Sequence, residues 1–360
     1  MAFSAGELSN IANAALDHYV RGPALAQSLQ DKPLMDALLK GTKTFAGGKD
    51  DISTPVKGDY TTAVEGFTHN DTVSYANPAN IKRAVAQWYE IHAGISLTLT
   101  ELKHDGISVV DSLNSDETTE HSNVELTRLT GLLEDKLDDM MEGWANTFND
   151  MLWADGTQDA KAVPGIQALI TSTATTGVAP ATGTIHGLDR STYSWWRNRA
   201  LTQAAKTTSA STNGGVLLQV LQEEIRQLRR YGGRPNLAVC GSDFLGALET
   251  ELRANGNYSQ TGFGGKQDAS VGAVHFGGMK FQYDPTMDGL NIDSVGAGSG
   301  SKYCFIIDTN HLKLWVMDGE DMKQHSPARP SDQYVMYRAL TWTGGLMANQ
   351  LNCHGVYAIA

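Results

Sequence analysis

The feature that most constrains this fold is a very long amphipathic helix, which the sequence predicts from Ser122 to Trp153. Ser122 to Glu125 forms a capping box, and Asp155-Gly156 supplies a stop signal. At about 1.5 Å per residue the helix measures roughly 45 Å, against ~53 Å for the width of a compact globule of this length. Such a rod suits a flat, extended subunit. The apolar residues recur at steps of three and four, on one helical stripe: Leu126, Leu129, Leu133, Leu137, Met140, Trp144, Phe148 and Leu152.

Two properties of this stretch leave alternatives open. Gly131 and Gly143 each lower helix stability by about 1 kcal/mol relative to alanine, so two shorter helices meeting at a bend are the alternative to one rod. The opposite stripe is acidic, with Arg128 and Lys136 as its basic residues. Such a face is either simply solvated or turned toward another polyanion without binding it. Its carboxylates are Glu134, Asp135, Asp138, Asp139 and Glu142.

Composition narrows the class of protein. The chain has 360 residues, of which 41% are hydrophobic and 8% aromatic, enough to build real cores. Its net charge of -12 argues against a general nucleic-acid binder, which needs Lys and Arg to neutralise phosphates. Cys240, Cys304 and Cys353 include no CxxC pair and indicate reduced thiols in a cytoplasm. With no apolar run of about 18 residues and no secretory signal, we expect a soluble chain without a membrane partner.

The first part of the chain reads as a thin arm. A helix is predicted over residues 4–21, opened by a Ser4–Glu7 capping box and closed by Gly22-Pro23. A second helical stretch runs from Leu25 to Leu38, interrupted by Pro33. Isolated helices this short are marginal in water, so both pieces are expected to need a surface to lie against.

Residues 46–106 are predicted to form a long β-hairpin with weak apolar faces. Short alternations occur at Tyr60–Val64, Thr72–Tyr75 and Ile95–Leu99, and Asn77–Asn80 reads as the turn. A two-stranded ribbon is barely stable alone, so it is expected to find its partner surface on a neighbouring molecule. The alternative is an ordinary sheet edge folded onto its own domain.

The remaining chain mixes helices and strands. A turn and a strand are expected over Val163–Ile170, followed by a loop from Thr171 to Gly187. Helices from Val216 to Leu228 and from Ser242 to Leu252 flank a buried strand, which is typical of a small α/β unit. The last third of the chain is mostly strand. The expected strands are Leu237–Cys240, Met279–Tyr283, Tyr303–Ile307, Leu312–Val316, Tyr334–Trp342 and Cys353–Ala360.

No catalytic, cofactor-binding or metal-binding residues are predicted, and we do not expect an enzyme. Gly264-Gly265-Lys266 fails the phosphate-loop pattern on both sides. The ten histidines are scattered without metal-ligand spacing, among them His311, His325 and His354. One basic cluster stands out. It is either a solvated helix end, where the dipole favours cations, or a contact with an acidic face of an adjoining subunit, and it consists of Arg226, Arg229, Arg230 and Arg234.

Three stretches carry a resemblance to a known family. Trp153–Thr157 followed by Pro164–Ile166, Phe276–Phe281 followed by Asp284-Pro285, and Arg338–Ala360 with its Gly344-Gly345-Leu346 link come in a familiar order. Arm, hairpin, long helix, α/β lobe and closing strands together resemble the major capsid protein of tailed bacteriophages, with the Hong Kong 97-type fold. The resemblance covers nearly the whole chain as an order of elements.

The resemblance implies an α+β fold with a defined division of the chain. It places an N-terminal arm at 1–45, an extended loop at 46–106, a peripheral domain at 107–187 built on the spine helix 122–153, an axial domain at 188–305, and closing strands shared by both domains at 306–360. Lys49 and Lys57 lie in the extended loop, but the partner Asn and catalytic Glu of the covalently crosslinked members are not identified, so crosslinking is not carried over.

The implied function is assembly of hexamers and pentamers into an icosahedral shell around double-stranded DNA. The expected partners are a separate scaffolding protein, a portal and a decoration protein, with the interior facing packaged DNA without specific binding. The expected location is the virion capsid, assembled in the host bacterial cytoplasm. The alternatives are an encapsulin-type compartment with enzyme cargo and, in a different class, a carbohydrate-processing enzyme or tail-associated adhesin.

Overall fold

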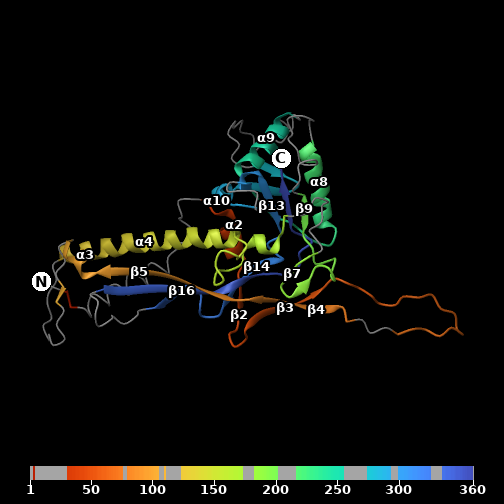
Figure 1. The fold of residues 1–360 in the computed structure, drawn as a ribbon, viewed down its shortest axis with the longest axis horizontal. Helices are drawn as coiled ribbons and strands as arrows, with labels where there is room; N and C mark the ends of the chain where they lie inside the picture. The colour runs from red at the N-terminus through yellow and green to blue at the C-terminus, as the bar shows by residue number, and fades with distance from the viewer. Residues whose placement is uncertain are drawn as a thin grey trace. The chain divides into compact units, whose positions relative to one another are not determined.

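A computed structural model describes residues 3–4, 31–75, 79–104, 109–110, 123–172, 182–201, 216–254, 274–292, 299–325 and 335–359. Figure 1 labels the helices and strands of the chain, which divides into two units. Unit 1 draws on Met1–Gln30, Tyr89–Asp150 and Val316–Thr343, and unit 2 on Asp31–Trp88, Met151–Trp315 and Gly344–Ala360. The predicted helix over 4–21 lies outside the described residues.

The long helix dominates unit 1. Helix α4 (Asn123–Trp153) is one continuous element of 31 residues, so the prediction of a single helix is confirmed and the two-helix alternative is wrong. The described part of its apolar stripe, from Leu137 to Leu152, is buried. Trp144 stacks on Phe148 with ring centroids 4.7 Å apart, and Phe148 meets the edge of Trp342 at 5.0 Å. A Cβ added at Gly143 would meet nothing within 4 Å, so no close packing contact requires a glycine at this position.

Strands and a short helix complete unit 1. Strand β5 (Tyr89–Thr98) and strand β15 (Lys323–His325) both pair with β16 (Val335–Ala348), and β1 (Phe3–Ser4) pairs with β6 (Val109–Val110). Helix α3 (Leu99–His104) opens with a capping box, in which Thr98 and Glu101 exchange bonds between side chain and backbone. Lys136 of α4 donates to Glu101 at 3.0 Å. The ion pair therefore ties α3 to the long helix.

Unit 2 is built on a six-stranded mixed sheet in the order β11-β12-β10-β13-β17-β9. Strand β10 is parallel to β12 and antiparallel to β13. Most of the strands expected here are confirmed, and a Gly277-Gly278 turn with positive φ at both residues joins β11 to β12. The strands are β9 (Arg199–Leu201), β10 (Leu237–Cys240), β11 (Val274–Phe276), β12 (Met279–Tyr283), β13 (Tyr303–Ile307) and β17 (Gly355–Ala358).

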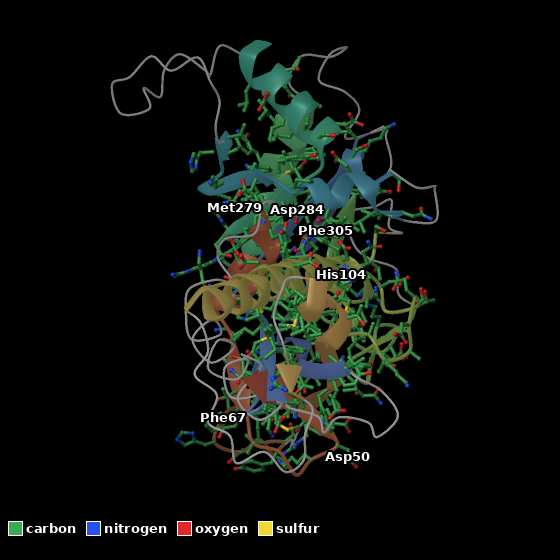
Figure 2. The ribbon with its side chains drawn as sticks, turned by 90° about the vertical axis from the view of Figure 1, so that its left-hand side faces the viewer. Asp50, Phe67, His104, Met279, Asp284 and Phe305 are labelled. Carbon is green, nitrogen blue, oxygen red and sulfur yellow. The ribbon has the colours of Figure 1, made fainter. Side chains whose placement is uncertain are left out.

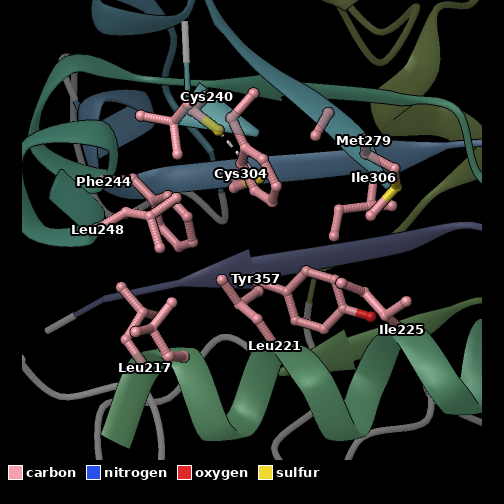
Figure 3. Close-up of a cluster of buried hydrophobic side chains, with 14 of the residues drawn as sticks. Leu217, Leu221, Ile225, Cys240, Phe244, Leu248, Met279, Cys304, Ile306 and Tyr357 are labelled. Carbon is pink, nitrogen blue, oxygen red and sulfur yellow. Dashed lines mark hydrogen bonds between the residues drawn. The ribbon is translucent and has the colours of Figure 1, made fainter. Parts of the chain in front are cut away.

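Two helices bury one face of this sheet. Helix α8 (Val216–Arg229) and helix α9 (Ser242–Ala254) form where the sequence predicts them. Figure 3 shows Leu217, Leu221 and Ile225 of α8 pointing toward Tyr357 of β17, with α9 closing the same cluster. Glu251 of α9 is fully buried and accepts bonds from the backbone N–H groups of Leu217 and Leu218, both at 3.1 Å. It therefore caps α8 from a neighbouring helix.

The other face of the sheet carries Trp153, the last residue of α4, which belongs to unit 2. Trp153 packs on Phe305 of β13 with ring centroids 5.4 Å apart. Helix α10 (Pro285–Gly289) begins at Asp284, whose side chain accepts from the Thr286 N–H. A short 3₁₀ turn, η2 (Ser299–Lys302), leads into β13. A second sheet has the strand order β15-β16-β14-β2, in which β14 (Leu312–Met317) and β2 (Lys43–Phe45) follow β16.

Two segments differ from the prediction. Helix α2 starts at Pro33 and runs to Lys40, so the proline begins the helix, where its missing N–H costs nothing. Leu34, Met35 and Leu38 are fully buried, so this piece does lie against a surface, and that surface is part of its own chain. Residues expected to form a strand near Ile166 form the short helix α5 (Ile166–Leu169) instead. The segment after it contains strands β7 (Thr184–Ile185) and β8 (Leu188–Asp189).

Strand β5 belongs to unit 1 and not with the hairpin, because the division between the units falls between Trp88 and Tyr89. No helix in the described part of the chain is both long and apolar enough to cross a membrane.

Candidate assembly surface

The predicted hairpin exists, but its strands lie elsewhere. Strand β3 (Asp51–Lys57) pairs antiparallel with β4 (Ile81–Gln87), from Asp51 opposite Gln87 to Lys57 opposite Ile81. The prediction of strands over Tyr60–Val64 and Thr72–Tyr75 is wrong, because neither segment forms the backbone hydrogen bonds of a β-sheet in the structure. The alternation of apolar and polar residues correctly predicts extended chain in this region, but it does not show which part of the region pairs as strands.

Between these strands the chain forms a segment that we call the extended loop, described at residues 58–75 and 79–80. Side chains hold it in the register that β3 and β4 set. Thr61 donates to Asn80 at 2.9 Å, and Glu65 accepts from the Ser74 N–H at 2.6 Å. That backbone bond lowers the pKa of the exposed Glu65 carboxyl. The loop is therefore a continuation of the ribbon, with polar side chains in place of a backbone ladder.

The turn at the far end lies at Thr68–Asp71. The Asp71 N–H donates to the Thr68 carbonyl at 2.9 Å, and the Asp71 carboxylate accepts from the Thr68 N–H at 2.8 Å and from its hydroxyl at 2.7 Å. The tip of the hairpin therefore lies at Thr68–Asp71 and not at the predicted turn Asn77–Asn80, of which Asn77 and Pro78 lie outside the described residues. Asp and Thr close turns through such local bonds, a signal that was present in the sequence.

Apolar side chains on this loop are largely exposed. Among the described residues seven large hydrophobic side chains are exposed, and five of them lie from Tyr60 to Ile81. Tyr75 is 93% exposed, Val64 92% and Phe67 65%. Figure 2 shows Phe67 well apart from Asp284 and Phe305 in the body of the unit. Exposed apolar side chains concentrated on one short segment of the chain indicate an interaction site, unlike single ones scattered over a surface.

The base of the ribbon, in contrast, packs on its own unit. Ile52, Val56, Ala84 and Ala86 are buried. The alternative of a sheet edge folded onto its own unit is therefore confirmed for the paired base, whereas the loop beyond it is exposed.

The segment from β7 to Trp196 holds that base. The Val85 N–H of β4 donates to the His186 carbonyl at 2.8 Å, and the ammonium of Lys82 lies 5.7 Å above the Tyr193 ring. Trp195 donates through Nε1 to Oδ2 of Asp59 at 3.0 Å. Gly58 lies against the same indole so closely that a Cβ there would be 1.9 Å from Cδ2. Sequence reasoning missed these contacts, which join residues more than 100 positions apart.

Hydrogen bonds to buried groups fix the conformation of that segment in the structure. Trp196 is fully buried and donates to the Ile185 carbonyl at 3.0 Å. Arg190, 2% exposed, donates to Leu169 O and to Asn198 Oδ1, and desolvation lowers its pKa to about 10. Arg197 in turn donates to the Arg190 carbonyl through two nitrogens.

The charged surfaces noted in the sequence are only partly described. The side chains of Glu134 and Asp135 lie outside the described set, while Asp138 and Asp139 are exposed on α4 and Glu142 is half-buried. The four arginines at the end of α8 are all exposed. Arg229 donates to Gly277 O at 2.6 Å, and Arg230 lies 5.4 Å from the Tyr231 ring. Among the described residues none of the four is within ion-pair distance of a carboxylate.

The titratable groups inside the fold serve packing. Burial lowers the pKa of His354 to about 4, and its Nδ1 accepts from the Asp308 N–H at 3.1 Å. His311 lies 4.0 Å from Asp308, while His325 contacts the Thr341 hydroxyl in unit 1. Cys240 and Cys304 are opposite each other on β10 and β13, with free thiols 3.1 Å apart. In the described part of the chain no group of three or more His, Cys, Asp or Glu side chains could hold a metal ion. Gly264–Lys266 lies outside it.

Comparison with solved structures shows which proteins share this architecture. The asymmetric unit of the cyanophage A-1(L) capsid is 16% identical, with a TM-score of 0.59 over 92% of this chain and 93% of that one. The capsid of the native GTA particle gives a TM-score of 0.53 at 13% identity over 97% and 98% of the two chains. The capsid of cyanophage P-SCSP1u gives 0.51 at 12% identity over 89% and 86%.

This chain has the fold of phage capsid proteins. The α+β, Hong Kong 97-type architecture expected from the order of elements is confirmed. No protein-family model matches the sequence, and no curated protein matches it either. The likeness is therefore one of backbone architecture, at sequence identities of 12 to 16%.

Proposed function

We propose that this chain is the major capsid protein of a tailed bacteriophage, and that its copies assemble as hexamers and pentamers into an icosahedral shell around double-stranded DNA. The observation that carries the proposal is the extended loop with its bare apolar side chains, Tyr60, Val64, Phe67 and Tyr75. The capsid fold of the whole chain supports it.

The physical argument concerns where apolar surface is buried. Exposed apolar area is unfavourable by roughly 25 cal/mol per Å², and a slender ribbon has no interior in which to hide it. Seated on a neighbouring copy, the loop contributes to an interface of the usual size, about 1,600 Å² in total. Repeated around a ring, the same head-to-tail contact closes into a symmetric oligomer.

The division of the chain is part of the same proposal. Residues 1–45 act as the arm, 46–106 as the region that contains the ribbon and its extended loop, 107–187 as the peripheral domain, 188–305 as the axial domain and 306–360 as the shared closing strands. The spine helix and the six-stranded sheet are the cores of the two main parts. A separate scaffolding protein, a portal and a decoration protein complete the assembly, which takes place in the host bacterial cytoplasm.

The acidic stripe of α4 is proposed to face the packaged DNA. Asp138 and Asp139 are exposed and repel phosphates, so the genome stays mobile against the wall. Replacing both with lysine (Asp138→Lys with Asp139→Lys) is expected to retain host nucleic acid in particles during assembly. Particles with the wild-type ratio of absorbance at 260 and 280 nm would contradict this orientation.

Electron microscopy of the expressed protein, with sequencing and mass spectrometry of nuclease-protected contents, tests the function. Shells tens of nanometres wide that package DNA when the other virion components are present support the proposal. Shells that enclose an enzyme would indicate an encapsulin-type compartment. A small oligomer that never forms shells would return the protein to the enzyme or adhesin class.

A further inference from the structure

We propose that Trp195 is a positioning residue for assembly: its indole fixes the direction in which the extended loop leaves the subunit, before any neighbour is present. The inference rests on the proposed function, in which that loop seats on another copy. The residues that carry it are Gly58, Asp59, Lys82, Val85 and Trp195, all within unit 2.

The attachment has two points, one on each strand of the ribbon. On the β3 side, Trp195 donates to Asp59 at 3.0 Å and covers the backbone of Gly58. On the β4 side, the Val85 N–H bonds to His186 O at 2.8 Å, and Lys82 lies over the ring of Tyr193. One contact would leave the ribbon free to swing about it, whereas contacts on both strands define a direction.

The absence of a side chain at position 58 is a specific requirement of this contact. A Cβ at Gly58 would lie 1.9 Å from the indole Cδ2 and 2.3 Å from Cε2, so any other residue must push the ring away. The displaced ring would lose its bond to Asp59. Gly66 lies in the same loop with nothing within 4 Å of its Cβ position, so it is a matched control.

The supporting segment is stiff enough to transmit position. Tyr193 and Trp195 have ring centroids 5.6 Å apart, and Trp195 meets the edge of the buried Trp196 at 5.7 Å. Asp189 closes the turn below them by accepting from the Ser191 N–H at 2.9 Å. A ribbon held this way is preorganised, and preorganisation lowers the entropy lost when a loop is ordered on binding.

The test measures loop direction and assembly separately. Cys240, Cys304 and Cys353 are buried, so spin labels attach only to cysteines introduced at exposed sites by Asn70→Cys in the loop and Gln222→Cys on α8. Doubly labelled protein is diluted with unlabelled protein, and the distance distribution is measured by pulsed electron paramagnetic resonance. Shell yield is measured in unlabelled protein by sedimentation.

We expect a narrow distribution for the wild type and for Gly66→Ala, and a broad one for Gly58→Ala and Trp195→Ala. Shell yield should fall by roughly tenfold in the last two, equivalent to about 1.4 kcal/mol. Trp195→Phe, which keeps the ring but loses the Nε1 donor, should be intermediate. Circular dichroism confirms that each variant is folded.

Shells and distributions in Gly58→Ala that match those in Gly66→Ala would overturn the positioning role and leave the capsid proposal standing. A wild type that forms no shells would overturn the capsid proposal, while the distance measurement would still decide whether Trp195 directs the loop. If Gly58→Ala broadens the distribution but shells form normally, the role in assembly is wrong.

Discussion

Trp153 donates a 2.9 Å hydrogen bond from its indole Nε1 to Oδ2 of Asp284. Both side chains are fully buried. The bond joins the last residue of α4 to the residue that caps α10, because Oδ1 of Asp284 accepts from the Thr286 N–H at 3.0 Å. A single carboxylate thus serves two donors from distant parts of the chain, and both of its oxygens are needed as acceptors.

Asp284→Asn tests this arrangement, because an amide has only one acceptor oxygen. Its NH₂ group must face either the indole N–H or the Thr286 N–H, so two buried hydrogen-bond donors point at each other and neither has an acceptor there. We expect unfolding free energy to fall by about 1–3 kcal/mol, measured by chemical denaturation. Asp288→Asn, whose carboxylate is less buried and accepts from Ser242 N–H and Tyr283 O–H, is the control and should cost less. Equal losses in the two variants would argue against a special role for Asp284.

The sequence predicted elements better than contacts. Helix α4 was predictable because its apolar stripe, capping box and stop signal agree, and β10 with its flanking helices because a short apolar run lies between two amphipathic ones. Residues 166–170 were misread as a strand because periodicity cannot separate so short an apolar run from a buried helical turn. The contact of Trp195 with Asp59 spans 136 positions and leaves no local pattern.

Arg199 and Glu224 form a second relationship that sequence could not reveal. Two guanidinium nitrogens of Arg199 on β9 donate to the carboxylate of Glu224 on α8, at 2.9 and 2.7 Å. Burial alone would lower the pKa of Arg199, but its bond to Glu224 raises it overall. Tyr357 also donates to Glu224, at 3.3 Å.

Breaking this pair from one side should be costly. Glu224→Met leaves the Arg199 charge without a carboxylate, and we expect a loss of roughly 3 kcal/mol in unfolding free energy. The double variant Arg199→Met with Glu224→Met should be more stable than Glu224→Met alone, because neither charge is then left buried and unpaired. A double variant whose loss equals the sum of the two single losses would show that the ion pair contributes little.

His354 should make the fold sensitive to mild acid. Its pKa in the folded state is lowered to about 4 from its ordinary value of 6.5, mainly by burial, and the neighbouring Asp308 opposes the shift while His311 adds to it. Between these pH values the unfolded chain binds a proton that the folded chain does not. Stability therefore falls as pH drops from about 6.5 toward 4, by up to about 1.4 kcal/mol per pH unit for this group.

His354→Asn keeps an acceptor near the position of Nδ1 for the Asp308 N–H but cannot be protonated. We expect part of the decline between pH 6.5 and 4 to disappear in this variant, as measured by denaturation midpoints across that range. The remaining slope belongs to other groups, among them the half-buried His186, whose pKa desolvation also lowers to about 4. A variant with the wild-type slope would show that His354 is protonated in the folded protein.

The apolar side chains of the extended loop allow stability and assembly to be separated. Val64 and Tyr75 are more than nine-tenths exposed, so removing them changes almost nothing inside the subunit. Val64→Ser with Tyr75→Ser should alter unfolding free energy by less than about 0.5 kcal/mol, as surface substitutions usually do. If the loop seats on a neighbouring copy, the same two side chains lose cover there, at about 1.5–3 kcal/mol each for full burial. Sedimentation should then show subunits that stay folded but assemble poorly.

Buried side chains of similar size behave in the opposite way, since Val56→Ser in β3 should lower stability first. Loop variants that assemble like the wild type would mean that the exposed apolar residues face solvent in the shell, and that another surface holds the copies together.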